Sequence, residues 1–475
     1  MIRSRTFLIN NKATIISFFI AILSYSIYVV FRGFGWDGDS FISASQFQKL
    51  IGSDLYGLLD GAAHPKILSI TLFGIVYQFT GGFYILTFIS ILLNALMISV
   101  IANWINNEKG VWIIAMFGLL INIPWTKIVV NCDNPAFSMP FIIFGLYNIS
   151  RNKYKIGAIF LVVSSLFRSG SEFIILTLII IQIFDKNLKN VVILLFAFVI
   201  SSLHTYFGYL LVYPSRDFFW EITWKYLTTS ENIADYKHSL NAFIPYILSV
   251  LKQLFTKYSI LFIIPFIIGL TRLYRKTNSI KYILLTPISS LILPIGSFIY
   301  GTAHRIYETK HMGFTFILPI FAAFSINSSI LLKFSKKTKL FISAIIIIVI
   351  ITFSIISGIF KNGDYEAHVN RTGKIGWTNL SDVKQDVKLL YPIKKINILT
   401  AYKYLTFTIL DVGKYANNID VVKTESEIDY HNINNYELII IPKAWSTASI
   451  NISNFGYIKK SNDYYNYYIS KNSNN

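Results

Sequence analysis

Two aspartates near the amino terminus have the spacing of a small acidic site. Asp37 and Asp39 flank one glycine in the run Trp-Asp-Gly-Asp-Ser-Phe, directly after the first apolar segment. Two carboxylates on such a turn can face one pocket, where they share a divalent metal ion or where one acts as general base for an incoming hydroxyl. The alternative is a solvated helix N-cap, because Asp39 precedes a helix-like pattern at residues 41–50.

Other polar groups stand at the borders of apolar segments. His64 and Lys66 flank a proline and offer cationic donors for a lipid phosphate, or are a surface histidine beside an interfacial lysine. Asp133 begins an apolar segment in the run Asn-Cys-Asp-Asn-Pro, where it is either functional or a helix cap. Arg168 and Glu172 separate two apolar runs, and their simplest interpretation is an ion pair one helical turn apart.

The composition indicates that membrane spans position these groups. Of the 475 residues, 54% are hydrophobic and 14% are charged, against roughly 25% charged residues in soluble domains. The single cysteine excludes an intrachain disulfide and a paired-cysteine zinc site. The net charge of +19 lies mostly in the first 361 residues, in short clusters between apolar runs. This pattern is typical of the cytoplasmic loops of a polytopic membrane protein rather than of nucleic-acid binding.

The apolar runs predict a mainly α-helical membrane protein with about 11 transmembrane helices. A span needs about 20 apolar residues, and shorter runs qualify when they pack among other helices. The long runs are residues 12–31, 83–104, 111–130, 191–212, 282–300, 313–332 and 340–360, and the short ones are 134–147, 156–167, 173–184 and 260–270.

Basic loops predict the orientation, because Lys and Arg are enriched on the cytoplasmic side. Successive spans cross the membrane in alternating directions. All the basic clusters then face the cytoplasm only if residues 67–79 and 243–257 do not span but form juxtamembrane or re-entrant helices on the outer side. The predicted protein lies in the plasma or inner membrane, with its amino terminus in the cytoplasm and its carboxyl terminus outside. The cytoplasmic clusters would be residues 1–5 with Lys12, 151–155, 185–189, 272–281 and 333–339.

The most concentrated basic cluster on the predicted outer face lies at residues 303–311. A basic cluster that only sets the orientation of the protein would lie on the cytoplasmic side. Binding of an anionic ligand at the membrane surface therefore explains this cluster better. The cluster includes His304, Arg305, Tyr307 and Lys310.

The carboxyl-terminal part changes character. We expect residues 1–361 to form the membrane module, with residues 32–82 as its first outer loop, and residues 362–475 to form a small extracytoplasmic α/β domain. Within this domain the patterns predict buried strands at 394–400 and 437–442, a helix at 404–416 and an edge strand at 464–470.

The residues resemble the GT-C superfamily of integral-membrane glycosyltransferases, most closely its protein O-mannosyltransferase and aminoarabinose-transferase branch. In that branch an outer loop after the first span opens with Asp-Glu and an aromatic residue. Asp37 is similar to the leading Asp, and Asp39 stands one residue later than the usual Glu. The run His64-Pro65-Lys66 resembles the second motif without its second proline.

The resemblance continues over roughly residues 12–330 in layout. Asp133 is similar to a further acid of the family, Arg168 and Glu172 to an Arg-x-x-Glu-like turn, and residues 305–319 to a basic-aromatic turn before a late span. The lumenal trefoil-type insertion of the eukaryotic mannosyltransferases is absent, because residues 214–241 are too few to hold it.

The resemblance implies an inverting transfer of a sugar from a polyprenyl-phosphate donor to an acceptor hydroxyl on a glycan, lipid or protein outside the cytoplasm. Asp37 is then the first choice for the general base, and Asp39 or Asp133 orients the acceptor or holds a metal. The need for Mg²⁺ or Mn²⁺ stays open, with Asp37 and Asp39 as the ligands if one is bound. The lipid-phosphate sugar donor would be bound by His64, Lys66, Arg168, Glu172, His304, Arg305, Tyr307 and Lys310.

Three other functions compete. One is an O-antigen or polysaccharide polymerase or ligase that uses polyprenyl-diphosphate glycans, although here the acidic pair follows the first span instead of lying in a late loop. Another is a multi-span transporter or flippase, although the apolar runs hold few ionisable groups and no repeat is visible. The last is a non-catalytic membrane scaffold.

Overall fold

The structure is a computed structural model, and it describes residues 12–32, 47, 66–80, 83–168, 171–212, 260–276, 317–372, 396–401, 416–422, 424–461 and 465–471. The chain divides into two compact units. The first, here called the helical unit, comprises Met1–Phe31 and Thr87–Gly358, and the second unit comprises Arg32–Leu86 and Ile359–Asn475. The predicted span at 282–300 and the predicted helices at 243–257 and 404–416 (except Ala416) lie outside the described residues.

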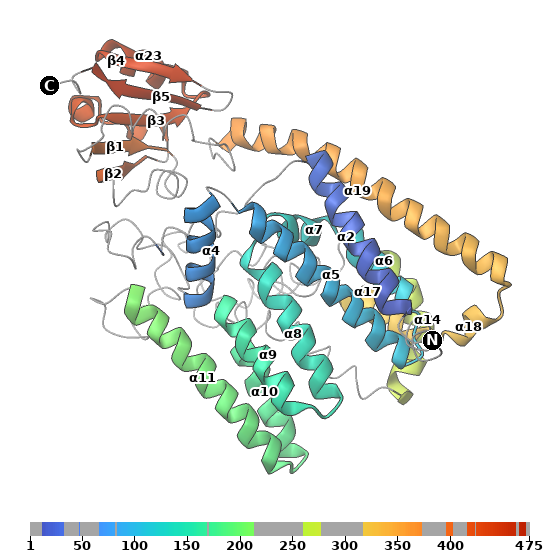
Figure 1. Cartoon of the computed structure of the whole chain (residues 1–475). Helices are drawn as coiled ribbons and strands as arrows, with labels where there is room; N and C mark the ends of the chain where they lie inside the picture. The colour runs from blue at the N-terminus through green and yellow to red at the C-terminus, as the bar shows by residue number, and fades with distance from the viewer. Residues whose placement is uncertain are drawn as a thin grey trace, which may run out of the picture. The chain divides into compact units, whose positions relative to one another are not determined.

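Most of the described chain is helical (Figure 1), as predicted. The helices follow the apolar runs closely, because a continuous apolar run of this length satisfies its backbone only within a helix when lipid surrounds it. The helices are α2 (Lys12–Arg32), α4 (Ile67–Thr80), α5 (Tyr84–Asn107), α6 (Trp112–Leu120), α7 (Ile123–Val130), α8 (Asn134–Ser150), α9 (Tyr154–Phe167), α10 (Ser171–Phe184), α11 (Leu188–Val212), η2 (Ile260–Phe262), α14 (Ile263–Lys276), α17 (Ile317–Ser325), α18 (Ser329–Leu332) and α19 (Lys336–Thr372).

Several of these helices can cross a membrane. Lys12–Arg32, Tyr84–Asn107 and Lys337–Ile359 are each long and apolar enough to do so alone. Helix α11 adds an exposed apolar face, and a soluble protein rarely leaves such a large apolar surface to water. The chain is therefore a membrane protein. The exposed residues on α11 are Leu188, Val192, Leu195, Phe196, Val199, Ile200, Leu203 and Phe207.

One predicted span is not continuous. Residues 111–130 form α6 and α7, which meet at an angle of 68°. The break has a local cause, because Pro124 lies in the first turn of α7 and the Asn122 side chain accepts a hydrogen bond from the Trp125 backbone N–H at 3.2 Å. The predicted run at 313–332 is also interrupted, between α17 and α18, where the Ser328 N–H donates to the Lys109 carbonyl at 2.9 Å.

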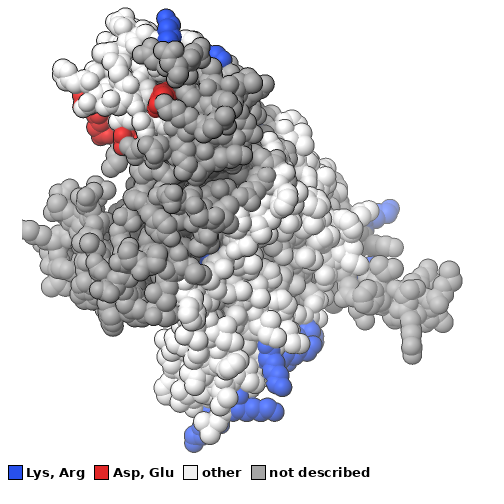
Figure 2. All heavy atoms as spheres, turned by 60° about the vertical axis from the view of Figure 1, so that its left-hand side comes forward, with Lys and Arg blue, Asp and Glu red and all other residues white. Residues whose placement is uncertain are grey.

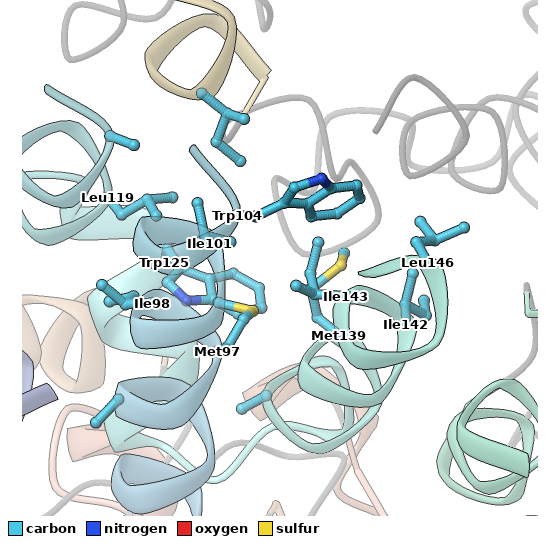
Figure 3. Close-up of a cluster of buried hydrophobic side chains, with 14 of the residues drawn as sticks. Met97, Ile98, Ile101, Trp104, Leu119, Trp125, Met139, Ile142, Ile143 and Leu146 are labelled. Atoms are coloured by element: carbon cyan, nitrogen blue, oxygen red, sulfur yellow. The ribbon is translucent and has the colours of Figure 1, made fainter. Parts of the chain in front are cut away.

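The core of the helical unit lies where α5 meets α6, α7 and α8. Because lipid tails are as apolar as leucine, this core is stabilised mainly by close packing and interhelical hydrogen bonds. Gly145 of α8 and Gly157 of α9 allow such packing, since a Cβ on Gly157 would lie 2.8 Å from the Gly145 carbonyl oxygen. Figure 3 shows the core side chains of Met97, Ile98, Ile101, Trp104, Leu119, Trp125, Met139, Ile142, Ile143 and Leu146.

The second unit contains α4 and a five-stranded mixed sheet with the order β2-β1-β3-β5-β4. The predicted helix at 67–79 is confirmed as α4, and its juxtamembrane position stays a prediction. Strands β1, β2 and β3 are parallel, and β5 pairs antiparallel with β3 and β4. The strands are β1 (Ile396–Thr400), β2 (Ala416–Val421), β3 (Leu438–Pro442), β4 (Tyr457–Ser461) and β5 (Tyr465–Ser470), and one helix, α23 (Ser446–Asn454), contacts β4 and β5.

The two buried strands predicted from the sequence are confirmed as β1 and β3, and the strand predicted at 464–470 is confirmed as β5, but its predicted edge position is wrong. β5 lies inside the sheet between β3 and β4, with Tyr467 opposite both Ile440 and Lys460. The reason is β4, which has one buried residue and four exposed ones and takes the edge position. Strand β5 is buried along nearly its whole length, which its tyrosine-rich sequence did not reveal.

Tyr436, in the connection before β3, is bonded to strand β2, and we expect it to make the unit sensitive to alkali. Its hydroxyl donates to Asp420 Oδ2 at 2.6 Å. Burial, and then the hydrogen bond to the carboxylate, raise the pKa of Tyr436 to about 12, from its ordinary value of 10.0. The folded state therefore favours the neutral phenol, and its contribution is complete below pH 10 and is lost as the pH rises to about 12.

Denaturant unfolding of the full chain in detergent, followed by circular dichroism from pH 8 to pH 12, checks this expectation. Tyr436→Phe should unfold at a lower denaturant concentration at pH 8 and should lose less stability than wild type on going to pH 12. Equal losses in the two proteins would contradict the assignment. Burial also raises the pKa of Tyr468, so the variant should reduce the alkaline loss without abolishing it.

Candidate functional site

Asp133 lies on a tight turn that joins α7 to α8. The Asp133 N–H donates to the Ile128 carbonyl at 3.1 Å, and the Cys132 N–H donates to the Val129 carbonyl at 3.3 Å. This is the Schellman pattern, which needs a left-handed residue at its corner. Cys132 takes that place with φ 57°, although a left-handed conformation costs a non-glycine residue about 1–2 kcal/mol. The surrounding contacts must therefore hold the turn in place.

A polar stripe on α5 supplies those contacts. Thr87, Ser90 and Asn94 recur at helical spacing on a helix that is otherwise mostly apolar. The Thr87 hydroxyl lies 3.0 Å from the Cys132 sulfur, and the Ser90 hydroxyl donates to a carbonyl in the last turn of α7 at 2.8 Å. The Asn94 amide donates to the Ala136 carbonyl, in the first turn of α8, at 2.8 Å. The stripe thus fixes both sides of the Asp133 turn.

The Asp133 side chain itself is buried, with 1% of its surface exposed. It occupies the N-cap position of α8, as the helix-cap interpretation expects, but its carboxylate makes no capping hydrogen bond. Burial of an ionised carboxylate is expensive, and acidic groups inside membrane proteins tend to be functional for that reason. Of the three predicted catalytic aspartates, Asp133 is the one within the described residues.

Arg168 and Glu172 flank the turn between α9 and α10, and both are half-buried. Three serines tie this turn to α8. The Ser171 hydroxyl donates to the Ser164 hydroxyl at 2.7 Å, and the Ser164 hydroxyl donates to the Ser138 carbonyl at 3.0 Å. Because Ser138 belongs to the second turn of α8, the Arg168 turn is anchored near the end of α8 at which Asp133 lies.

The directions of the helices explain this gathering. Helix α5 runs parallel to α8, because its start contacts Cys132 while Asn103, near its end, donates to the Tyr147 hydroxyl at 2.9 Å. Helix α9 runs antiparallel to α8, since the rings of Phe137 and Phe167 are 5.5 Å apart. Asp133, Arg168 and Glu172 therefore share one end of the helical unit, here called the acidic end after Asp133.

The opposite end of these helices is basic. The turns after α5, α8 and α10 each hold a left-handed residue, and all three turns carry lysine or arginine. Figure 2 shows Lys and Arg side chains gathered at the lower edge, where the α8–α9 and α10–α11 turns of Figure 1 lie, below a broad uncharged surface. The basic residues at this end are Lys109, Arg151, Lys153, Lys155, Lys186 and Lys189.

The remaining predicted site residues lie in the second unit or outside the described residues. Lys66 is buried, with 2% of its surface exposed, and its carbonyl accepts from the Ile70 N–H at the start of α4, in the second unit. The others lie outside the described residues, and these are Asp37, Asp39, His64, His304, Arg305, Tyr307 and Lys310. Within the described part, no three His, Cys, Asp or Glu side chains group as metal ligands; the predicted metal pair is not among the residues searched.

Sequence reasoning missed two residues of the acidic end. One is Asn94, whose side chain is fully buried and whose Oδ1 has no hydrogen-bond partner in the described structure. Its signal was the polar spacing at 87, 90 and 94 within an apolar run. The other is His204, which lies in the half of α11 nearer the acidic end and has both ring nitrogens buried. An ionisable residue within an apolar run was its signal.

Comparison with known proteins does not show a family for this chain. No protein-family model matches the chain, and no curated protein matches it.

Proposed function

We propose that this chain is a membrane glycosyltransferase of GT-C-like architecture, with about 11 spans, that transfers a sugar from a polyprenyl-phosphate donor to an acceptor hydroxyl. One observation carries the proposal: a buried carboxylate, Asp133, lies at the same end of the helical unit as Arg168 and Glu172, opposite the basic turns. A transfer enzyme needs an acid or base and a cation near one membrane surface, and this end supplies both.

The charge distribution supports an outer location for the acidic end. Lys and Arg are enriched in cytoplasmic loops, so the basic turns belong in the cytoplasm and Asp133 belongs near the opposite surface. A lipid-linked sugar presents its phosphate at that depth. The α/β domain at residues 362–475 is likewise proposed to lie outside the cytoplasm, where it would be available to an acceptor.

The chemistry follows from the charges involved. The acceptor oxygen attacks the anomeric carbon, the bond from that carbon to the phosphate oxygen breaks, and polyprenyl phosphate leaves. A carboxylate takes the hydroxyl proton, because a sugar hydroxyl is a poor nucleophile while protonated. Asp37 is the proposed base and Asp133 orients the acceptor, while Lys66, Arg168 and Arg305 stabilise the charge that develops on the phosphate.

A transfer assay tests this function. The full chain in proteoliposomes is given a panel of polyprenyl-phosphate sugars, and loss of each donor is followed for wild type and Asp37→Asn. We expect one donor to be consumed by wild type, and we expect Asp37→Asn to reduce that rate at least a hundredfold, within the range of general-base catalysis at about 10²–10⁴. Asp185→Asn, an exposed aspartate at the basic end, is the control.

Other outcomes separate the competing functions. Consumption of polyprenyl-diphosphate glycans alone would favour a polymerase or ligase. Passage of sugar lipids or small solutes across the bilayer without loss of any donor would favour a transporter. Full activity in Asp37→Asn would remove Asp37 from the chemistry and leave Asp39 and Asp133 as candidates for the base.

A further inference from the structure

The sheet of the second unit has a topological switch point. From β1 the chain goes to β2 on one side, and it then returns to β3 on the other side of β1. Where the order of parallel strands reverses in this way, the connections leave in opposite directions and open a crevice at the carboxyl ends of the strands. At this edge lie Thr400 and Ala401 after β1, and residues 443–447 after β3.

At this edge the chain departs from a local rule. Trp445 is the N-cap residue of α23 and makes no capping hydrogen bond, although Ser, Thr, Asp and Asn are the residues that cap helices. Capping is supplied by a distant residue, Glu425, whose Oε1 accepts from the Ala448 N–H. A tryptophan at a position that favours a small polar side chain is a local departure of the kind that natural proteins show at functional sites.

The groups around Trp445 are accessible and varied. Trp445 is half-buried, with its apolar body against the core of the sheet, and Lys443, Ser446 and Thr447 are exposed. Glu425 is half-buried, and a carboxylate accepts more hydrogen bonds than the one that Ala448 uses. An aromatic face beside donors, hydroxyls and a carboxylate suits a ligand with C–H faces and many hydroxyl groups, which is the chemistry of a saccharide.

Helix α23 is held rigidly enough to present these groups. The Ser449 hydroxyl accepts from the Lys459 ammonium at 2.8 Å and from the Tyr468 hydroxyl at 2.6 Å. These bonds join the helix to β4 and β5 (Figure 1). A site on an element fixed in this way keeps its geometry when a ligand arrives.

We propose that Trp445 and Glu425, at the carboxyl edge of the parallel strands, form a saccharide-binding site. Its identification as the site for the acceptor glycan rests on the proposed function, whereas the binding itself does not. The saccharide lays an apolar ring face on the indole of Trp445. Its hydroxyls donate to Glu425, and they exchange hydrogen bonds with Ser446 and Thr447.

Binding of the full chain in detergent to an immobilised panel of saccharides tests this site. The panel holds oligomers of neutral hexoses, of N-acetylhexosamines and of uronic acids. We expect wild type to bind at least one class, Trp445→Leu to bind it about tenfold more weakly, and Trp445→Phe to stay within about threefold of wild type. Leucine keeps the apolar contact with the core and removes the aromatic face, so a loss of binding reports the ring.

Phe455→Ala is the matched control, because Phe455 is an aromatic residue at the other end of α23, with 41% of its surface exposed. It should bind the panel as wild type does. The site is overturned if wild type binds no saccharide, or if Trp445→Leu binds as well as wild type. Donor loss in proteoliposomes is measured separately, so binding without donor loss would reject the proposed function and keep this site.

Discussion

Asp133→Asn should lower the rate of sugar transfer at least a hundredfold while leaving the unfolding midpoint close to that of wild type. Asparagine has nearly the same shape, so the α7–α8 turn keeps its backbone hydrogen bonds. The side chain is 1% exposed, and the amide keeps an oxygen acceptor at nearly the same place, so the variant should stay folded. Lower activity at equal or higher stability is the signature of a residue kept for function.

The measurement is donor turnover in proteoliposomes together with the thermal unfolding midpoint in detergent. Asp185→Asn is again the control, since it makes the same chemical change on an exposed residue at the basic end. If the turnover of Asp133→Asn stays within about threefold of wild type, Asp133 has only a structural role as the N-cap residue of α8. A lower unfolding midpoint with full activity would assign it the same structural role.

Asn94→Ala should have the second largest effect, because Asn94 positions the turn that carries Asp133. Its amide donates to the Ser90 carbonyl and to the Ala136 carbonyl, each at 2.8 Å. Interhelical hydrogen bonds in membrane proteins contribute about 0.6 kcal/mol on average and up to about 1.7 kcal/mol. We expect a loss of stability of about 1–2 kcal/mol and a tenfold or larger loss of turnover, because a small displacement of a catalytic group is costly.

Asn103→Ala provides a close control for this prediction. Asn103 is the same residue type on the same helix, and it also bonds α8, through the Tyr147 hydroxyl at 2.9 Å, but at the basic end. It should lose comparable stability and keep wild-type turnover. If the two variants lose turnover equally, the effect of Asn94 is a general loosening of the α5–α8 contact and the positioning role is rejected.

Much of the architecture follows from the sequence alone. The apolar runs predicted the helices α2, α5, α8, α9, α10 and α11 nearly to their ends, because a helix in lipid is determined by the hydropathy of its own residues. Helix α19 continues to Thr372, beyond the predicted run at 340–360. The all-apolar run in β3 and the patterns of β1 and β5 predicted three of the five strands. The change in hydropathy pattern along the sequence also predicted a helical part followed by a mixed α/β part.

The tertiary structure decided the features that depend on distant partners. The interior position of β5 depends on its pairing with β3 and β4, and no pattern within β5 records where its neighbours lie. The role of the polar stripe of α5 could be recognised only in the folded structure, where the Asn94 amide donates to the carbonyl of Ala136, 42 positions later. Composition and periodicity are local properties of the chain, whereas strand order and long-range hydrogen bonds arise from packing. Thus the sequence by itself predicted a helical membrane protein with a small α/β part, and folding decided which distant side chains hold the Asp133 turn in place.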